Sequence, residues 1–224
     1  MTSMTTLFAS ARIGLTRISS ARFVPTRPRA ALIAALFVIL ALGGFNSPAA
    51  SGNPYRGLLV DPPRPLRSLM LVDHFGRRTK FPAKNGRWQL VFFGYTHCGS
   101  VCPLSMQKMK VVLHEMGADR DKLDFLFISI DKQRDNPKNI KKFLSRFDSR
   151  ILGLTGRHRR ISSLQRQFKI VTRRYQGGTA LGYRLEHSIF LYLLNGKGQI
   201  RLMYPSNASP DDLTRDLKLI LNAG

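Results

Sequence analysis

The chain has 224 residues, which is enough for one domain with a sizeable core and a separate N-terminal segment. Lys and Arg number 36 against 13 Asp and Glu, so the net charge is +23 and favours acidic proteins or membrane headgroups as partners. The sequence contains no nucleic-acid-binding motif and no basic stripe interleaved with aromatic residues, so we expect no nucleic-acid partner.

The N-terminal segment has the composition of a membrane-targeted sequence. Residues 1–29 are rich in Arg, Ser and Thr and contain no acidic residue, and residues 30–47 contain no charged residue at all. Such a run is longer than the core of a secretory signal, about 7–15 residues, and slightly shorter than a typical span of about 20 residues. We predict an uncleaved membrane anchor with a cytoplasmic N-terminus, because the basic residues precede it. A signal peptide cleaved near residues 48–50 and a mitochondrial transit peptide are the alternatives.

Residues 48–65 are rich in Gly, Ser, Asn and Pro and are predicted to be a tether to a folded domain at residues 66–224. Within the domain, short apolar runs predict strands, and apolar residues at helical spacing predict helices. The expected strands are 68–73, 88–93, 125–130, 189–194 and 199–204, the last two joined by a Gly-containing hairpin. The expected helices are 103–116, 137–147, 161–168 and one capped by Ser209, whereas residues 171–186 are expected to form a long loop. This order indicates an α/β domain with a central mixed sheet.

The two cysteines, Cys98 and Cys102, are four positions apart and follow an apolar strand. Because four residues approximate one helical turn, the two sulfur atoms converge at a helix N-terminus if the helix begins near Cys102. There, the unpaired N–H groups and the helix dipole favour the thiolate. The pair therefore fits three interpretations, namely a structural disulfide, a redox pair or a soft-metal site that needs at least one more ligand.

The five histidines differ in how well they are placed to be that ligand. His114 and His158 lie in polar or Arg-rich surroundings and are expected on the surface, and His74 is expected in a turn. His97 is adjacent to Cys98, but its side chain is expected to point away from the sulfur pair. His187 precedes the strand at 189–194, and the start of that strand can lie beside the strand end that carries Cys98, which makes it the best candidate.

Three methionines on the helix after the cysteines, Met106, Met109 and Met116, are potential copper ligands by chemistry alone. Their spacing places them on one helix face with apolar neighbours. We therefore expect them to fill the core.

Four motifs in order resemble the Sco/SenC family of membrane-anchored copper proteins. They are the cysteine motif at 93–103, Ile128-Ser129-Ile130-Asp131 with Arg134-Asp135, Gly153-Leu154-Thr155-Gly156, and Glu186-His187-Ser188 before a strand and a Gly hairpin. The similarity covers about residues 66–222. It implies a thioredoxin-like fold, with Cys98, Cys102 and His187 as copper ligands.

The resemblance also implies a role as a metallochaperone that delivers copper to, or prepares, the copper centre of cytochrome c oxidase. The implied partners are the copper-bearing oxidase subunit and other copper chaperones. The implied location is a bacterial inner membrane with the domain in the periplasm, or alternatively the mitochondrial inner membrane facing the intermembrane space. The enzymatic alternative is a thiol–disulfide reductase that uses Cys98 and Cys102 on the cysteines of the oxidase copper site and does not need His187.

The chain departs from the usual family pattern at three places near these motifs. Gly99-Ser100-Val101 stands where Pro-Asp-Val is common, Lys132 stands where Pro is common, and Glu186 stands where Asp is common. None of these changes removes a predicted ligand. They are expected to affect the choice of partner. Asp131, at the end of its strand, is either a group that hydrogen-bonds near the ligands and supports them or the cap of a turn.

Overall fold

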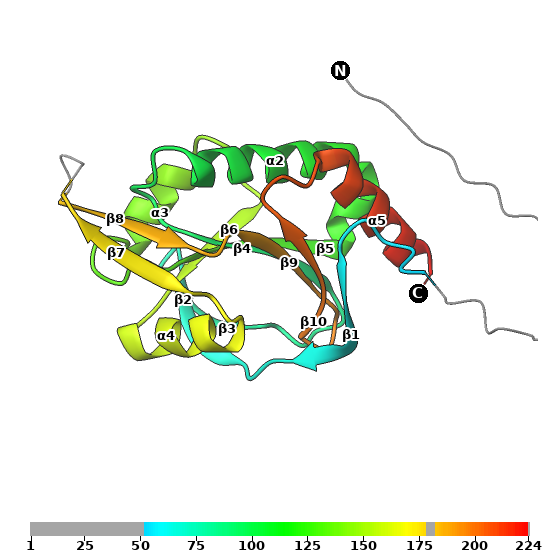
Figure 1. Cartoon of the computed structure of the whole chain (residues 1–224), viewed down its shortest axis with the longest axis horizontal. Helices are drawn as coiled ribbons and strands as arrows, with labels where there is room; N and C mark the ends of the chain where they lie inside the picture. The colour runs from blue at the N-terminus through cyan, green and yellow to red at the C-terminus, as the bar shows by residue number, and fades with distance from the viewer. Residues whose placement is uncertain (1–51, 178–181, 224) are drawn as a thin grey trace, which may run out of the picture. The chain divides into compact units, whose positions relative to one another are not determined.

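The computed structural model describes residues 52–177 and 182–223. Its centre is a mixed sheet with the strand order β1–β10–β9–β4–β5–β6–β2–β3 (Figure 1). The strands of this sheet are β1 Leu58–Pro65, β2 Leu69–Asp73, β3 Arg78–Phe81, β4 Trp88–Gly94, β5 Leu123–Ser129, β6 Ile151–Thr155, β9 Phe190–Leu194 and β10 Gln199–Pro205. A separate pair of antiparallel strands, β7 Thr172–Gln176 and β8 Tyr183–His187, forms a ribbon. The helices are α2 Val101–Glu115, the 3-10 helix η1 Gly117–Lys122, α3 Pro137–Leu144, α4 His158–Gln167 and α5 Pro210–Asn222.

The three parallel strands β4, β5 and β6 form the middle of the sheet, and β9 joins β4 in the antiparallel direction. From Gln89 to Gly94, every residue of β4 is buried, because helices cover both faces of the sheet. In Figure 1, α2 and α5 lie on one side of the sheet and α4 lies on the other. The mixed α/β sheet predicted from the sequence is therefore confirmed.

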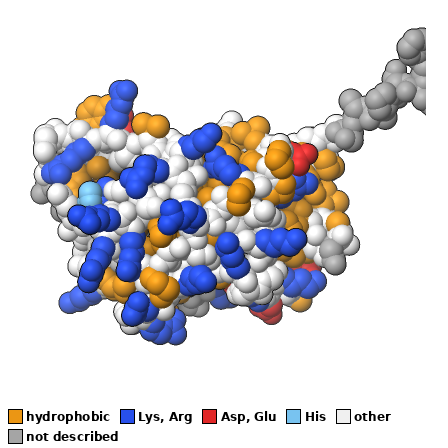
Figure 2. Space-filling view, turned by 90° about the horizontal axis from the view of Figure 1, so that it is seen from below, with side chains coloured by type: hydrophobic (Ala, Val, Ile, Leu, Met, Phe, Trp, Pro, Cys, Tyr) orange, Lys and Arg blue, Asp and Glu red, His pale blue; other side chains and the backbone are white. Residues whose placement is uncertain are grey.

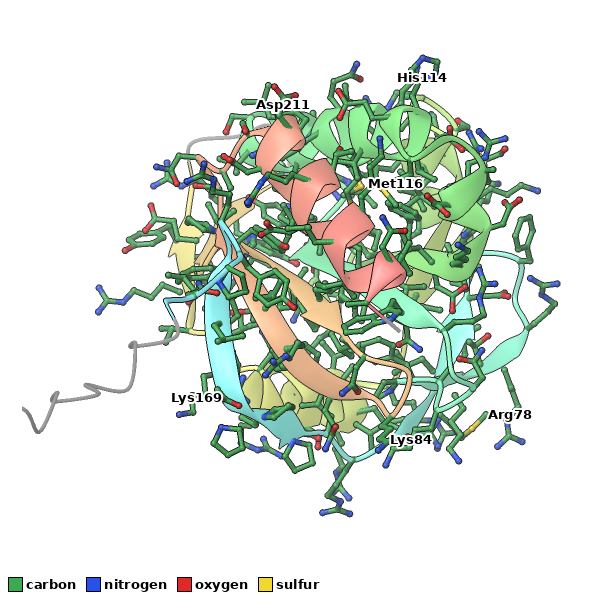
Figure 3. The ribbon with its side chains drawn as sticks, turned by 90° about the vertical axis from the view of Figure 1, so that its right-hand side faces the viewer. Arg78, Lys84, His114, Met116, Lys169 and Asp211 are labelled. Carbon is green, nitrogen blue, oxygen red and sulfur yellow. The ribbon has the colours of Figure 1, made fainter. Side chains whose placement is uncertain are left out.

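Local sequence signals explain where the helices begin. The Asn136 side chain accepts a hydrogen bond of 2.9 Å from the Asn139 N–H and caps α3. Ser209 and Asp212 form a capping box at the start of α5. Helix α5 packs against α2, and Figure 3 shows His114 on the outer side of α2 and pointing away from the domain.

The predicted tether is too long, because its last residues, Leu58–Pro65, form the edge strand β1. The strand pairs with β10 but has an irregular register between Leu59 and Arg64. Prolines are tolerated at such edges and bulges, since no ladder hydrogen bond is lost there. The carboxylate of Asp216, which is fully buried, accepts hydrogen bonds from the N–H groups of Arg56 (3.1 Å) and Gly57 (2.9 Å), so the chain is fixed to the domain even before β1.

The long loop predicted at 171–186 is also wrong, because most of it forms the ribbon of β7 and β8. Strand β7 lacks the alternating apolar pattern that predicts a strand, since it carries Arg173 and Arg174 and is mostly exposed, whereas β8 alternates over only five residues. The two strands pair along their whole length, from Thr172 opposite His187 to Gln176 opposite Tyr183.

The predicted basic segment at residues 1–29 and the predicted anchor at residues 30–47 lie outside the described residues, as do the first residues of the tether. None of the helices within residues 52–177 and 182–223 is both long and apolar enough to cross a membrane.

Candidate metal centre

The two cysteines lie where β4 passes into α2. Helix α2 begins at Val101, two residues earlier than predicted, so Pro103 occupies the first turn, where N–H groups have no helical partner. The Ser100 side chain does not cap this helix. Instead, the Cys102 N–H points at the Cys98 sulfur at 3.4 Å. Both cysteines are free thiols, Cys98 half-buried and Cys102 buried.

The two thiols differ strongly in acidity. A hydrogen bond from the Cys102 thiol, together with the N–H groups of Ser100, Cys102 and Val101, lowers the pKa of Cys98 to about 5 despite its partial burial. The same hydrogen bond and deep burial raise the pKa of Cys102 above its usual range. At neutral pH, the pair is therefore one thiolate and one thiol that share a proton between their sulfur atoms.

Gly94, the last residue of β4, makes room for the buried sulfur. A Cβ atom at this position would lie 2.8 Å from the Phe92 ring and 3.0 Å from both the Cys102 sulfur and the Phe127 ring. Real Cβ contacts are longer than this, so a side chain here displaces the sulfur or the aromatic core. Gly94 thus allows α2 to seat Cys102 directly against the sheet.

His187 precedes β9, which pairs with β4, as predicted, but it is the last residue of β8 and therefore belongs to the ribbon and not to a long loop. Its ring packs edge-on against Phe92 and Tyr95, with centroid distances of 6.5 and 6.4 Å. Its Nδ1 lies 2.9 Å from the Ser188 carbonyl oxygen. Since a carbonyl only accepts, Nδ1 carries the hydrogen and Nε2 has the free lone pair. Burial lowers the pKa of His187, which keeps the ring neutral and able to bind a metal.

The structure brings His187 towards the cysteines but not into a closed site. Within the described ranges, one group of three His, Cys, Asp or Glu residues has ligand atoms all within 4.8 Å of one another, and it consists of His97, Asp131 and Asp135. Cys98, Cys102 and His187 do not meet this criterion. For all three to hold one ion, the His187 ring and the two sulfur atoms must come closer together.

Tyr95 links the ribbon to the cysteine loop. Its hydroxyl accepts a hydrogen bond of 3.4 Å from the Leu185 N–H on β8. Burial and the neighbouring Cys98 charge raise the pKa of Tyr95, so it remains a neutral phenol. Tyr95 therefore holds β8 beside the thiolate, and its ring is one wall of the space that His187 occupies.

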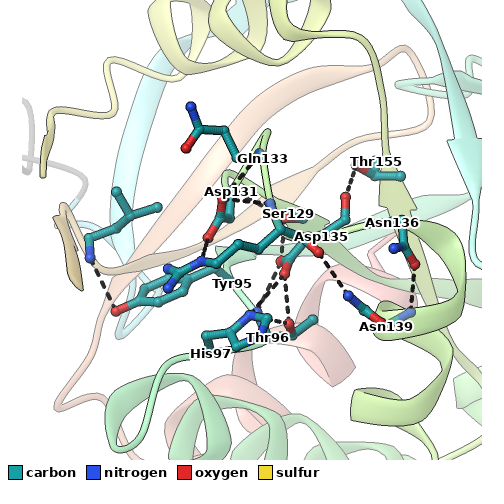
Figure 4. Close-up of polar contacts among 12 residues, drawn as sticks. Tyr95, Thr96, His97, Ser129, Asp131, Gln133, Asp135, Asn136, Asn139 and Thr155 are labelled. Atoms are coloured by element: carbon teal, nitrogen blue, oxygen red, sulfur yellow. Dashed lines mark hydrogen bonds and ion pairs between the residues drawn. The ribbon is translucent and has the colours of Figure 1, made fainter. Parts of the chain in front are cut away.

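A buried carboxylate, Asp135, supports the loop from beneath (Figure 4). It accepts hydrogen bonds from the Thr96 N–H (2.9 Å), the Thr96 hydroxyl (2.6 Å) and the Ser129 hydroxyl (2.6 Å). The His97 ring faces this network and lies 3.6 Å from Asp135, so it points away from the sulfur atoms as expected. Burial raises the pKa of Asp135, because the surrounding protein keeps water away from its carboxylate. Sequence reasoning missed this role, because residues 96 and 135 are far apart in the chain.

Asp131 joins the turn after β5 to the ribbon. It accepts hydrogen bonds from the Gln133 and Arg134 N–H groups at 3.2 Å, which makes it the cap of this turn. It also accepts hydrogen bonds from the Tyr183 hydroxyl and the Arg134 guanidinium, each at 2.6 Å. Burial alone would raise the pKa of Asp131, but these hydrogen bonds outweigh it and lower the pKa. Because the oxygens of Asp131 and Asp135 have these partners, hydrogen bonding accounts for the His97–Asp131–Asp135 group without a metal.

The remaining candidate ligands are structural or lie on the surface. His74 is buried and accepts a hydrogen bond of 2.8 Å from the Gly153 N–H, whereas His114 and His158 are exposed. Met106 and Met109 of α2 and Met116 directly after it belong to the core. This confirms the prediction that these methionines pack in the core.

The chain is similar in sequence and in structure to several known proteins. The SCO1/SenC family model matches residues 65–222. A SCO2-like protein of Rickettsia felis is 32% identical over 151 residues, which cover 66% of this chain and 73% of that protein. The structure of Bradyrhizobium japonicum ScoI with copper bound matches with a TM-score of 0.63 and 31% identity, covering 68% of this chain and 97% of that one. The copper-bound structure of Arabidopsis thaliana ScoI matches with a TM-score of 0.64 and 25% identity, covering 70% and 98%. The predicted thioredoxin-like fold is thereby confirmed.

Proposed function

Because this chain belongs to the SCO1/SenC family, we propose that it is a copper chaperone for the assembly of cytochrome c oxidase. In this proposal Cys98, Cys102 and His187 Nε2 hold one copper ion as cargo. The observation that supports it most is a thiolate and a thiol at the start of α2, faced by a neutral imidazole on an adjacent ribbon. Two sulfur atoms and one imidazole nitrogen suit three-coordinate Cu(I), because soft ligands select this ion.

Loading requires two changes that the residues are arranged to make. Cys102 must lose its proton, and its neighbour Cys98 is already ionised at neutral pH. The His187 ring must approach the sulfur pair, for which its Nδ1 hydrogen bond to Ser188 keeps Nε2 as the free nitrogen. Oxidation of the two thiols to a disulfide would remove both sulfur ligands and so release the ion.

The location and partners belong to the same proposal. The predicted anchor places the domain on the outer side of a bacterial inner membrane, with the mitochondrial inner membrane as the alternative. The acceptor is the copper-bearing subunit of the oxidase, and the donor is another copper chaperone. The positive charge of the domain favours acidic faces on both.

An anaerobic copper(I) titration of the reduced full-length chain in detergent tests the site. The wild type should bind one equivalent of copper through sulfur and nitrogen, as measured by X-ray absorption. A His187→Ala variant should retain sulfur ligation but bind more weakly. His158→Ala is the matched control, because His158 is exposed and distant from the cysteines in the chain. Equal affinity in the wild type and the His187→Ala variant would rule out His187 as a ligand.

Thiol–disulfide exchange is the second candidate function, and the low pKa of Cys98 favours it. A thiolate attacks disulfides, and Cys102 would then resolve the mixed disulfide. This reaction uses both cysteines and does not use His187. If the chain is a reductase, the His187→Ala variant should still reduce a disulfide-bonded peptide from the oxidase copper site. The same variant should no longer transfer copper.

A further inference from the structure

A cavity of about 440 Å³ lies under the ribbon, beside α4 and the turn after β5. The proposed copper site does not use it. Four basic side chains from three different elements line it, namely Lys132, His158, Arg166 and Arg174. Figure 2 views the domain from below in Figure 1, where α4 lies, and shows many Lys and Arg side chains with few acidic ones on that face.

Lys132 and Arg174 are held in place by partners that carry no negative charge. Lys132 Nζ donates a hydrogen bond of 2.9 Å to the Ser162 hydroxyl and lies 3.1 Å from His158 Nε2. The Arg174 guanidinium stacks on the Tyr183 ring at 3.8 Å and donates to the Gln133 side chain at 3.0 Å. Burial, and then the charge of Arg166, lower the pKa of Lys132. Lys132 and Arg174 are therefore oriented without a carboxylate partner.

The positive charge in this cavity lacks a carboxylate to balance it. In residues 52–177 and 182–223, no ion pair within 4.0 Å joins Lys132, Arg166 or Arg174 to an acidic side chain. Asp131 lines the cavity, but the Tyr183 hydroxyl and Arg134 already occupy its oxygens. Lys132 is half-buried and Arg166 and Arg174 are exposed. Cations gathered around one cavity repel one another, so an anion that enters it gains from all of them.

We infer that this cavity binds a phosphate group. A phosphate offers several acceptor oxygens in different directions, and here donors approach from α4, from the turn after β5 and from β7. Arginine and lysine together suit this anion, because guanidinium groups bind two oxygens at once and an ammonium group adds a point charge. The phosphate comes either from free phosphate or from a lipid headgroup, which share this chemistry.

Such a ligand would tie the ribbon to α4. Tyr183 and Leu185 line the cavity, and they alternate along β8 with exposed residues, so they are on the same face as His187. A phosphate bound between Arg166 of α4 and Arg174 of β7 would hold the two elements together. If the proposed copper site is correct, the same ligand would also steady its third ligand, although phosphate binding itself does not depend on copper.

A phosphate titration of the copper-free full-length chain in neutral detergent, at constant ionic strength set with sodium chloride, tests the inference. Nuclear magnetic resonance should show saturable shifts at the amides of Lys132, Ser162 and Arg174. Lys132→Gln and Arg166→Gln should each weaken binding by about 10-fold, the effect of losing one hydrogen bond to a charged group. Lys218→Gln is the control for net charge, because Lys218 is exposed on α5. Both cavity variants replace side chains that are not in the core, so folding is preserved, as the amide spectrum will report.

A second titration, in the same detergent, identifies the source of the phosphate by using a water-soluble, short-chain phosphatidylglycerol. If this lipid shifts the amides of Lys132, Ser162 and Arg174, and Lys132→Gln weakens the effect, the cavity takes a lipid headgroup. If only inorganic phosphate shifts these amides, it takes free phosphate. Both results support the site. Unsaturable or absent shifts, or the same loss in Lys218→Gln as in Lys132→Gln, would overturn it. Binding of a polyglutamate peptide but not of phosphate would overturn it as well.

Discussion

Replacement of Cys102 by Ala tests why Cys98 is a thiolate. The pKa of Cys98 is about 5 in the folded chain against an ordinary value of 9.0, and the hydrogen bond from Cys102 is the largest cause. A hydrogen bond to a charged group is worth roughly 1.5–3 kcal/mol, and about 1.4 kcal/mol corresponds to one pKa unit. The N–H groups of Ser100, Val101 and residue 102 all remain in the variant. We therefore expect the pKa of Cys98 to rise to roughly 6–7 in Cys102→Ala.

The pKa is measured from the ultraviolet absorbance of the thiolate and from the alkylation rate with iodoacetamide, each as a function of pH. In the wild type, reaction at Cys98 should reach half its maximum near pH 5, in agreement with the pKa of about 5. Cys98→Ala is the control, because Cys102 is buried and should form no thiolate at neutral pH. A pKa that stays near 5 in Cys102→Ala would show that the thiol hydrogen bond is not the cause. A wild-type value near 9 would contradict the geometry at the start of α2.

Three further predictions follow from buried groups. Copper(I) binding at pH 7 should release about one proton, from Cys102, as calorimetry in buffers of different ionisation enthalpy will measure. Asp216→Asn should lower the free energy of unfolding by roughly 2–3 kcal/mol in urea denaturation, because the buried oxygens that accept from the Gly57 N–H and its neighbours are altered. Gly153→Ala should cost about 1–3 kcal/mol in the same assay, since its Cβ would lie 2.2 Å from a core methyl group, whereas Gly99→Ala, with open space around it, should change stability by less than about 0.5 kcal/mol.

The parts of the fold that the sequence predicted are those with local causes. The strand before the cysteines is a continuous apolar run, and α3 and α5 begin at Asn136 and Ser209, whose side chains cap them. The convergence of Cys98 and Cys102 at a helix N-terminus depends only on helical geometry. Each of these features is decided within a few residues, so a single sequence is sufficient to predict it.

The parts that were missed depend on partners far away in the chain. Strand β1 contains prolines and is held by β10, and Asp216 holds the residues just before it, neither of which the composition of the segment can indicate. The ribbon is Arg-rich and is fixed by its register and by Tyr183, whose hydroxyl binds Asp131 52 positions away. The support of Thr96 by Asp135 spans 39 positions. In all three cases, buried carboxylates organise segments whose sequence looks like loop.

The distribution of these supports suggests how a copper ion is exchanged. The sulfur side of the site is rigid, because Cys102 is seated against the sheet at Gly94 and Asp135 holds the loop from below. The imidazole side rests on a ribbon outside the main sheet, and two-stranded sheets are only marginally stable by themselves. If Cys98, Cys102 and His187 hold copper as proposed, ligand release should begin at His187, and the ion should remain on the two sulfur atoms until an acceptor's thiolates replace them. The Tyr95 contact with Leu185 and the Tyr183 contact with Asp131 then set how easily the ribbon opens.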